Sequence, residues 1–450
     1  MNMILFLVTL GILGVAYLIV ARQASKKVEN REDYFLSGRG IGFTALTFTL
    51  LATQIGGGTV LGAAEEAFRR GWIVMLYPLG HALGLFALAT GFGSRLNKLG
   101  LTTIAEIFEK IYSSKLLRQI ASILSIVSLF LILVGMGIAA QKFLGALGFT
   151  RGYLFTGFWL VMTIYTVLGG LSAVVGTDVL QTLFFIIVTL VTFAFSSTSG
   201  MTSSVAPVVA SASNVPWMMW LSGPLLFAFI EQDMGQRCFA AKSARTVSWS
   251  AAASGFVLLA FTTIPIYFGV LARSVGFVPR EGSSVLLGIV SATTPTVVGT
   301  LFASALLMMI VSTADSLLCS ISSNLAFDFP ILQRGKSRFN VRASQLITLA
   351  VGMAAMGASY CFDNVVDVLM LSYELSISAL FVPIFMGVLA PQKCTKAAAF
   401  GSIIFGVLAF ACFKLWIPPM PKEILTLVIS FVGFFLFKLL GRTVQTIETL

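Results

Sequence analysis

Apolar stretches recur along almost the whole chain, and short segments rich in charged residues, Gly, Pro or Ser separate them. Each stretch is about 20 residues long, which is the length that an α-helix needs to cross the hydrocarbon core of a bilayer. A chain in lipid must satisfy its own backbone hydrogen bonds, so these stretches are expected to be helices. The pattern predicts thirteen transmembrane helices, near residues 2–21, 41–65, 72–93, 117–140, 152–170, 174–195, 215–231, 247–271, 296–326, 342–361, 365–389, 397–416 and 423–441.

The composition indicates an all-α integral membrane protein. Of the 450 residues, 57% are hydrophobic and 10% are charged, whereas a soluble domain carries roughly a quarter charged residues. Residues 1–450 are therefore expected to form a single polytopic membrane domain. The first stretch lacks the basic start and the cleavage site of a signal peptide, so we interpret it as a retained helix. Segment 101–112 is predicted to be a short helix at the membrane surface, and the uncharged segment 196–213 a mobile external loop.

The polar residues that remain argue against several classes of protein. The chain has one His and five Cys without CxxC spacing, and no nucleophile–base pairing is legible, so the sequence does not indicate an enzyme. The net charge is +11, but no cluster of basic residues with aromatic neighbours indicates binding to nucleic acid. The excess of Lys and Arg therefore has to be explained by the membrane.

The distribution of Lys and Arg predicts the orientation of the chain. If the N-terminus is outside, 21 of the 29 Lys and Arg residues fall on the inner side and 8 on the outer side. Positively charged residues collect in cytoplasmic loops. The sequence therefore predicts an external N-terminus and a cytoplasmic C-terminus, in the plasma (inner) membrane.

The second predicted span carries three successive glycines, Gly56 to Gly58, in the sequence ATQIGGGT. Each glycine weakens a helix by roughly 1 kcal/mol relative to Ala. Close helix packing is one explanation, since glycine is common at transmembrane interfaces. Polar residues on both sides of the glycines favour an unwound segment that lines a cavity and offers backbone carbonyls to a cation.

The seventh predicted span is interrupted by Ser222-Gly223-Pro224. Proline removes a backbone donor and clashes with the preceding turn, so a break is expected there. Two interrupted helices five spans apart predict an inverted-repeat transporter. We expect repeats at 41–198 and 214–390, an extra helix at 1–21 and two peripheral helices at 397–441.

Four motifs, in this order along the chain, resemble the sodium:solute symporter family, and the resemblance covers residues 33–390. They are DYFLSGRGIG (33–42), YTVLGGLSAVVGTDVLQ (165–181), EQDMGQRCFAAKS (231–243) and IVSTADSLLCSISSNLAFD (310–328). The resemblance implies a leucine-transporter-like inverted-repeat fold with a sodium ion between the second and ninth spans. Carried over residue by residue, the sodium ligands would be the carbonyls of Ala52, Ile55 and Met309 and the hydroxyls of Ser312 and Thr313.

Asp178 and Asp315 are acidic residues within predicted spans, and such residues are usually functional or paired. Asp315 shares one face of the ninth span with Ser312 and Ser316, at i, i+3 and i+4 spacing. The resemblance implies that Asp178, with the hydroxyls of the ninth span, could form a second sodium site or an ion exit path. The alternative is that Asp315 only holds two helices together.

Other polar or flexible residues within the spans are candidates for the solute site. His81 could be a neutral histidine bonded to a neighbouring helix or a proton relay, and Glu374 could face the cavity, pair with a cation or hold a proton. The full set of candidates is Gln54, Gly57, Gly58, Thr59, His81, Ser222, Gly223 and Glu374.

These observations predict a secondary active transporter that uses sodium as its coupling ion. The solute would be a small organic molecule, such as an amino acid, sugar, carboxylate or vitamin-like compound, carried by alternating access. Two alternatives remain open, namely a proton-coupled symporter of the same fold and a membrane module that senses a solute.

Overall fold

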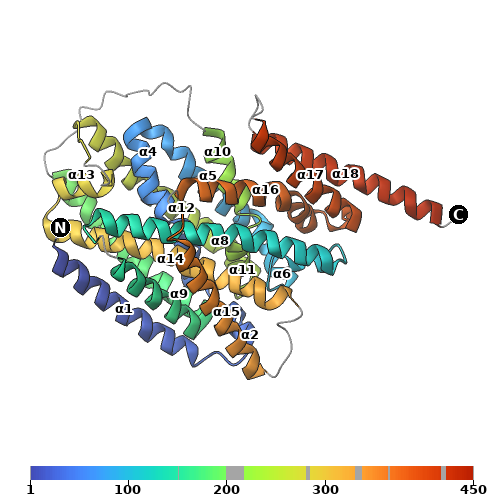
Figure 1. Ribbon diagram of the computed structural model, residues 1–450, viewed down its shortest axis with the longest axis horizontal. Helices are drawn as coiled ribbons and strands as arrows, with labels where there is room; N and C mark the ends of the chain where they lie inside the picture. The colour runs from blue at the N-terminus through green and yellow to red at the C-terminus, as the bar shows by residue number, and fades with distance from the viewer. Residues whose placement is uncertain are drawn as a thin grey trace.

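The computed structural model describes residues 2–149, 152–198, 217–279, 284–329, 337–362, 365–416 and 422–448. In this part of the chain the regular structure is helical, apart from one isolated backbone bridge between Ile41 and Ala241. Within the same residues, ten helical segments are long and apolar enough to cross a membrane. Figure 1 shows the long helices packed together as a bundle, as the hydropathy pattern predicts.

The helices in chain order are α1 (Met3–Ser25), α2 (Arg31–Leu36), α3 (Phe43–Gln54), α4 (Ala63–Arg70), α5 (Leu76–Ala87), α6 (Gly93–Leu99), α7 (Glu106–Lys110), α8 (Lys115–Ala146), α9 (Tyr153–Thr198), α10 (Trp217–Phe227), α11 (Gln232–Ala240), α12 (Ala244–Ser274), α13 (Val285–Thr293), α14 (Thr296–Asp328), α15 (Ser337–Ala358), α16 (Val365–Leu389), α17 (Lys396–Leu415) and α18 (Lys422–Glu448). Short stretches of tighter or wider helix lie at Ser37–Arg39, Gly58–Gly62, Gly71–Met75, Leu88–Phe92 and Pro391–Lys393.

Each of the thirteen predicted spans coincides with helix, but two pairs are joined differently from the prediction. The predicted spans 152–170 and 174–195 form the single long helix α9, which changes direction at Gly170 (φ 54°, ψ −143°). A Cβ atom at Gly170 would lie 2.2 Å from the carbonyl oxygen of Tyr34. Both the turn and the close approach therefore require glycine. The second pair is joined at Gly71, so that helical structure runs from Gly58 to Leu99.

Helix α14 lies at the centre of the bundle. Its most apolar 18-residue window is 89% buried, compared with 17% for α1. It packs against α1, α3, α8, α9 and α15, and Figure 1 shows it near α8 and α9. Polar side chains are buried along it from Ser304 to Asp328. The central helix therefore brings many polar groups into the interior, where they need partners.

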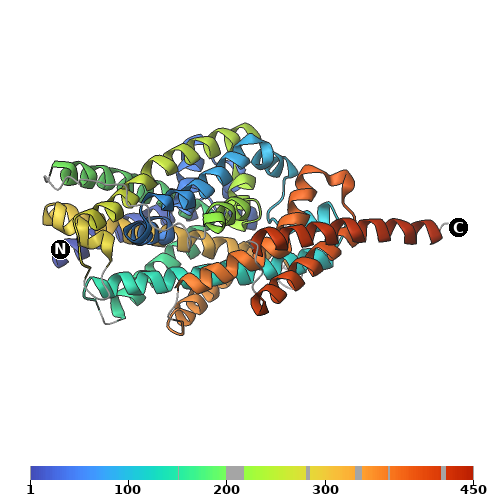
Figure 2. The same cartoon turned by 90° about the horizontal axis from the view of Figure 1, so that it is seen from above.

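The helices at the two ends of the chain lie at the periphery. Helix α1 packs along α9 and α14, and α17 and α18 pack against each other and against α16. The crossing of α17 and α18 is close, because a Cβ atom at Gly401 would lie 2.5 Å from the carbonyl oxygen of Gly433. Figure 2 shows α18 extending past the other helices at the C-terminal end.

Several shorter elements connect the long helices. The predicted surface helix at 101–112 is present as α7, whereas α2, α11 and α13 are too short for the hydropathy pattern to reveal. Helix α13 lies in the segment between α12 and α14, and Glu65 on α4 accepts a 2.7 Å hydrogen bond from the backbone nitrogen of Val285. The predicted mobile loop at 196–213 lies mostly outside the described residues.

Candidate ion and solute site

The second predicted span is broken where the sequence indicates. Helix α3 ends at Gln54, and Ile55 has non-helical backbone angles (φ −92°, ψ 79°). The next N–H, of Gly56, would continue the helix by bonding to the carbonyl of Ala52, but it donates instead to the hydroxyl of Thr59 at 2.9 Å. That hydroxyl donates to the carbonyl of Gln54 at 3.0 Å. Thr59 therefore stabilises the unwound segment, and the carbonyl of Ala52 loses its helical donor.

Helix α14 meets this break at Thr313. A Cβ atom at Gly56 would lie 2.8 Å from Oγ1 of Thr313, so the backbone of the break and the hydroxyl are in direct contact. The same hydroxyl lies 3.3 Å from the carbonyl of Met309, to which it donates. Ala52 and Ile55 are also buried. The structure therefore brings four of the five residues predicted to bind sodium to one place, with carbonyl and hydroxyl oxygens that suit a hard cation.

Ser312, the fifth residue predicted to bind sodium, forms its hydrogen bond with a buried carboxylate. Its hydroxyl donates to Oδ1 of Asp178 at 2.5 Å. Oδ2 of Asp178 accepts a 2.5 Å hydrogen bond from Thr49 on α3 and a 3.2 Å hydrogen bond from Arg237 on α11. The side chains of Asp178 and Arg237 are completely buried. This carboxylate therefore connects α9 with α3, α11 and α14.

Arg237 lies in the interior, whereas the charge analysis of the sequence counted it among the Lys and Arg residues on the inner side of the membrane. Its guanidinium donates to Thr49 at 2.8 Å, to Ser316 at 2.6 Å and to the backbone carbonyl of Asp233 at 3.1 Å, besides Asp178. A charged side chain is stable in the interior only when it is paired and hydrogen-bonded. The sequence did contain one signal for a buried cation, namely Asp178 and Asp315 within predicted spans, because such acidic residues are usually paired.

Asp315 belongs to the same buried cluster. Tyr165 on α9 donates a hydrogen bond to Oδ2 of Asp315, and the hydroxyl of Ser316 lies 3.4 Å from Oδ1. The three residues predicted as a second sodium site or exit path, Asp178, Asp315 and Ser316, thus lie together around the guanidinium of Arg237. The guanidinium of Arg237 therefore already supplies a positive charge at the predicted second sodium site.

A cavity opens beside the break of α3. It has a volume of about 50 Å³ and is bounded by α3, α5, α8, α10, α14 and α16. Four of the predicted solute-site residues line it, namely Gln54, Gly58, Thr59 and His81. Nδ1 of His81 lies 3.1 Å from the carbonyl of Tyr77 one turn earlier, which is the arrangement expected of a neutral histidine that donates from this nitrogen. Gly57 instead faces Ile310 of α14 and Ala139 of α8.

The break of the seventh span lies later than predicted. Helix α10 continues through Ser222, Gly223 and Pro224 to Phe227, and the chain becomes extended at Glu231 (φ −69°, ψ 126°) before α11 begins. Proline removes the hydrogen bond to the carbonyl four residues earlier, at Trp220. A Cβ atom at Gly80 of α5 would lie 2.8 Å from that carbonyl. Close packing against α5 therefore supports the helix past Pro224, and this correction moves the break to 228–231.

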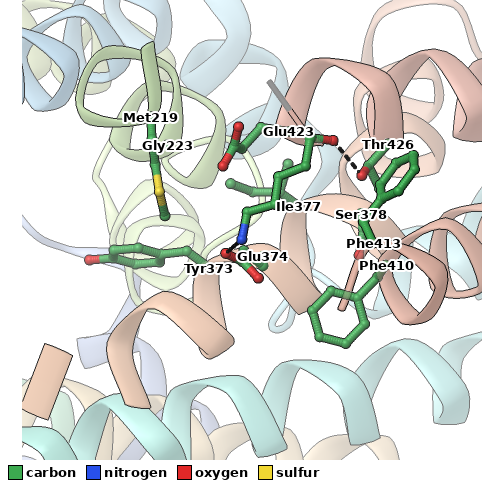
Figure 3. Close-up of a pocket in the computed structure, with 11 residues that line it drawn as sticks. Met219, Gly223, Tyr373, Glu374, Ile377, Ser378, Phe410, Phe413, Glu423 and Thr426 are labelled. Carbon is green, nitrogen blue, oxygen red and sulfur yellow. Dashed lines mark hydrogen bonds and ion pairs between the residues drawn. The ribbon is translucent and has the colours of Figure 1, made fainter. Parts of the chain in front are cut away.

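Besides Gly57, three predicted solute-site residues lie outside this cavity, namely Ser222, Gly223 and Glu374. Ser222 donates to the carbonyl of Met218 at 2.8 Å, and Gly223 lines a neighbouring pocket together with Glu374. Glu374 pairs with Lys414 at 2.8 Å and also with Lys422. Figure 3 shows Glu374 in this second pocket. Of the three roles left open for Glu374, the structure supports pairing with cations, because α17 and α18 bring two lysines to it.

Four residues that the sequence analysis did not single out complete the wall of the cavity. Tyr77 is on α5, Phe227 on α10, Glu231 at the break after α10 and Tyr373 on α16. Glu231 begins a motif that the sequence analysis recognised, and Tyr373 is next to Glu374. Only the packing of α5, α10 and α16 shows that these side chains face one space.

Comparisons with known proteins identify the family of the chain. Residues 34–406 match the sodium:solute symporter family. The sodium/glucose cotransporter of Vibrio parahaemolyticus is 28% identical over 287 residues, which are 57% of this chain and 51% of that protein. High affinity choline transporter 1 of Mus musculus is 24% identical over 444 residues, which are 90% of this chain and 74% of that protein. The chain thus spans about half the length of the glucose cotransporter.

The solved structures show the same fold. A sodium-coupled sialic acid symporter, in a substrate-bound outward-open state, superimposes with a TM-score of 0.77 over 97% of this chain and 98% of that chain, at 17% sequence identity. The agreement extends over nearly the full length, so the fold is the leucine-transporter-like one. With the family match over most of its length, the chain belongs to the sodium:solute symporter family, and it is a multi-pass membrane transporter rather than an enzyme.

Proposed function

We propose that this sodium-coupled symporter binds its ion where the break of α3 meets α14, and its solute in the adjacent cavity. The observation that carries the proposal is the contact of Gly56 with Thr313, where an added Cβ atom would lie 2.8 Å from the hydroxyl oxygen. Unwound backbone releases carbonyl oxygens, and discontinuous helices in transporters use such oxygens for sodium. The ligands in this proposal are the carbonyls of Ala52, Ile55 and Met309 and the hydroxyls of Ser312 and Thr313.

The hydrogen bonds of the two hydroxyls support this role. Ser312 donates its proton to Asp178, and Thr313 donates its proton to the carbonyl of Met309. Each hydroxyl oxygen therefore keeps lone pairs that can face a cation. Asp178 would act on the ion through Ser312, by orienting the hydroxyl and making its oxygen more negative.

We further propose that one sodium ion is bound in each transport cycle. A second ion at Asp178, Asp315 and Ser316 would compete with the guanidinium of Arg237, which donates to Asp178 and to Ser316. Arginine stays protonated in proteins, so its charge is permanent. In this proposal Arg237 takes the place of a second coupling ion and holds α11 against α9 and α14.

Alternating access follows from the position of the ion. Sodium would bridge the broken helix α3 and the central helix α14, so its binding and release would change how firmly these elements are held together. The solute lies beside the same break, since Gln54, Gly58 and Thr59 line the cavity. One ion can therefore influence both the contact between α3 and α14 and the solute site.

The test is uptake of labelled solutes by proteoliposomes that contain the purified protein. The solutes should include glucose and choline, which the names of two relatives mention, together with amino acids and carboxylates. We expect accumulation with an inward sodium gradient and none when potassium replaces sodium. Accumulation driven by a proton gradient in potassium alone would contradict the proposal and favour the proton-coupled alternative.

A further inference from the structure

We propose that the solute carries a positively charged ammonium group, which binds between Glu231 and an aromatic wall of the cavity. The inference rests on the solute site proposed above and specifies its chemistry. It combines three features of the cavity: four aromatic rings on one side, one carboxylate at the break after α10, and a lining without Lys or Arg among the described residues.

The aromatic wall extends across three helices. On α5, the rings of Tyr77 and His81 are 4.7 Å apart at 84°. Between α10 and α16, the rings of Phe227 and Tyr373 are 4.6 Å apart at 60°. A side-chain hydrogen bond between Tyr77 and Tyr373 joins the two pairs, and all four side chains line the cavity. Aromatic faces attract cations, and several rings around one space are the usual setting for binding an alkylammonium group.

Glu231 gives the cavity its negative charge. It is the one acidic residue among those that line this pocket. Its carboxyl group forms side-chain hydrogen bonds with Asp233 on α11 and with Gln54 at the end of α3. A positively charged solute in this space would have a carboxylate to pair with, whereas a neutral solute would not gain that interaction. The site therefore favours a solute that carries a positive charge.

The basic residues near the cavity do not line it. Among the described residues that line the cavity, none is Lys or Arg. Arg237 donates to Asp178, Ser316, Thr49 and the carbonyl of Asp233, and its charge also attracts Glu231. Lys414 and Lys422 pair with Glu374 in the second pocket, which shares Tyr373 with the cavity. A solute that carries only a negative charge would therefore meet Glu231 and no cation, so the site disfavours organic anions.

An ammonium group can belong to an organic cation or to a zwitterion that also has a carboxylate. Thermal stabilisation of the purified protein can distinguish them, with choline as the cation, betaine and proline as zwitterions, and 3,3-dimethyl-1-butanol as the uncharged isostere of choline. In sodium we expect at least one ammonium probe to stabilise the protein, with an affinity about tenfold or more above that of its uncharged isostere. Stabilisation by glucose or lactate and by none of the ammonium probes would overturn the inference.

A second measurement needs no knowledge of the natural solute. Met136 of α8 lines the cavity outside the proposed ion and ammonium sites, so Met136→Cys can report on the local charge in a variant whose native cysteines are replaced. The reagents are trimethylammonium-ethyl and hydroxyethyl methanethiosulfonate. Each rate is divided by the rate of the same reagent with a free thiol. On this scale we expect the cationic reagent to react faster than the neutral one. Glu231→Gln should lower this preference about tenfold or more, and Glu231→Asp should largely preserve it.

The outcomes separate the two proposals. Equal preference for the cationic reagent with and without Glu231 would refute the ammonium site while leaving sodium symport intact. If Glu231→Gln changes the sodium concentration for half-maximal response and not the affinity for ammonium probes, the carboxylate serves the ion, and the inference is wrong. If neither reagent reaches Met136→Cys under any sodium condition, the cavity is not exposed in the transport cycle, which contradicts the proposed function itself.

Discussion

Asp178 and Arg237 form an ion pair of 3.2 Å in which both side chains are completely buried. The pair connects the long helix α9 with the short helix α11. The hydroxyls of Thr49, Ser312 and Ser316 and the carbonyl of Asp233 provide its further hydrogen bonds. Taking two charges out of water is costly, so such a pair persists only when its geometry and secondary contacts are good. Removing one partner alone strongly destabilises the protein, because the other charge then stays buried without a counter-charge.

Arg237→Met should therefore destabilise the protein by about 3–5 kcal/mol, because it leaves the buried carboxylate of Asp178 without a counter-charge. The double variant Arg237→Met with Asp178→Asn should recover part of the loss. The measurement is the free energy of unfolding in detergent, or the midpoint of thermal unfolding where unfolding is irreversible. A double variant less stable than Arg237→Met alone would show that the two residues do not stabilise each other.

Gly56→Ala tests the contact between the break of α3 and α14. The added Cβ atom would lie 2.8 Å from Thr313 Oγ1, so the hydroxyl or the backbone must move. We expect the sodium concentration for half-maximal uptake to rise markedly while the protein still reaches the membrane. Gly223→Ala is the matched control, because a Cβ atom there meets nothing within 4 Å. Equal sodium dependence in the two variants would contradict the proposed ion site.

Thr313→Ala removes one proposed ligand, as does Ser312→Ala. Each should cost on the order of 1–3 kcal/mol of ion binding, by analogy with a buried polar group left unpaired. That corresponds to roughly 5- to 150-fold in sodium affinity. Thr313→Ser keeps the oxygen and should be much milder. Solute affinity at saturating sodium should change far less, and wild-type sodium dependence in both alanine variants would place the ion elsewhere.

Glu374→Gln should have little effect on the sodium and solute dependence of uptake. Glu374 is paired with two partly exposed lysines, Lys414 and Lys422, in the second pocket. Partly exposed ion pairs contribute about 0–1 kcal/mol each. A small loss of thermal stability, reduced at high salt, is the expected result. A change of more than about tenfold in solute affinity, equivalent to 1.4 kcal/mol, would show that Glu374 takes part in transport.

The orientation predicted from Lys and Arg can be tested with single cysteines in a variant without native cysteines. Lys26→Cys, after α1, should be shielded in intact cells, and Arg69→Cys, at the end of α4, should react with an impermeant reagent. Both side chains are exposed in the structure. Labelling of Lys26→Cys alone from outside would reverse the assignment.

Much of the fold could be predicted from the sequence, because hydrophobicity and helix breaking are local properties. Spans of about 20 apolar residues must be helical in lipid, whichever neighbours they pack against. The three glycines near Gly56 weaken their own helix, so the break of α3 was also visible. Pro224 gave the wrong position for the break of the seventh span, because the packing of Gly80 against α10 supports the helix beyond it.

The chemistry of the site was decided by the tertiary structure. Arg237 and Asp178 are 59 positions apart, and Ser312 and Asp178 are 134 apart, so their pairing depends on which helix faces meet. The same holds for Glu231, Tyr77 and Tyr373, which share a cavity only because α5, α10 and α16 converge. Glu374, one residue from Tyr373, points into a different pocket for the same reason. Sequence patterns determine where helices form and break, whereas the packing of those helices determines which buried charges find partners and which face the solute.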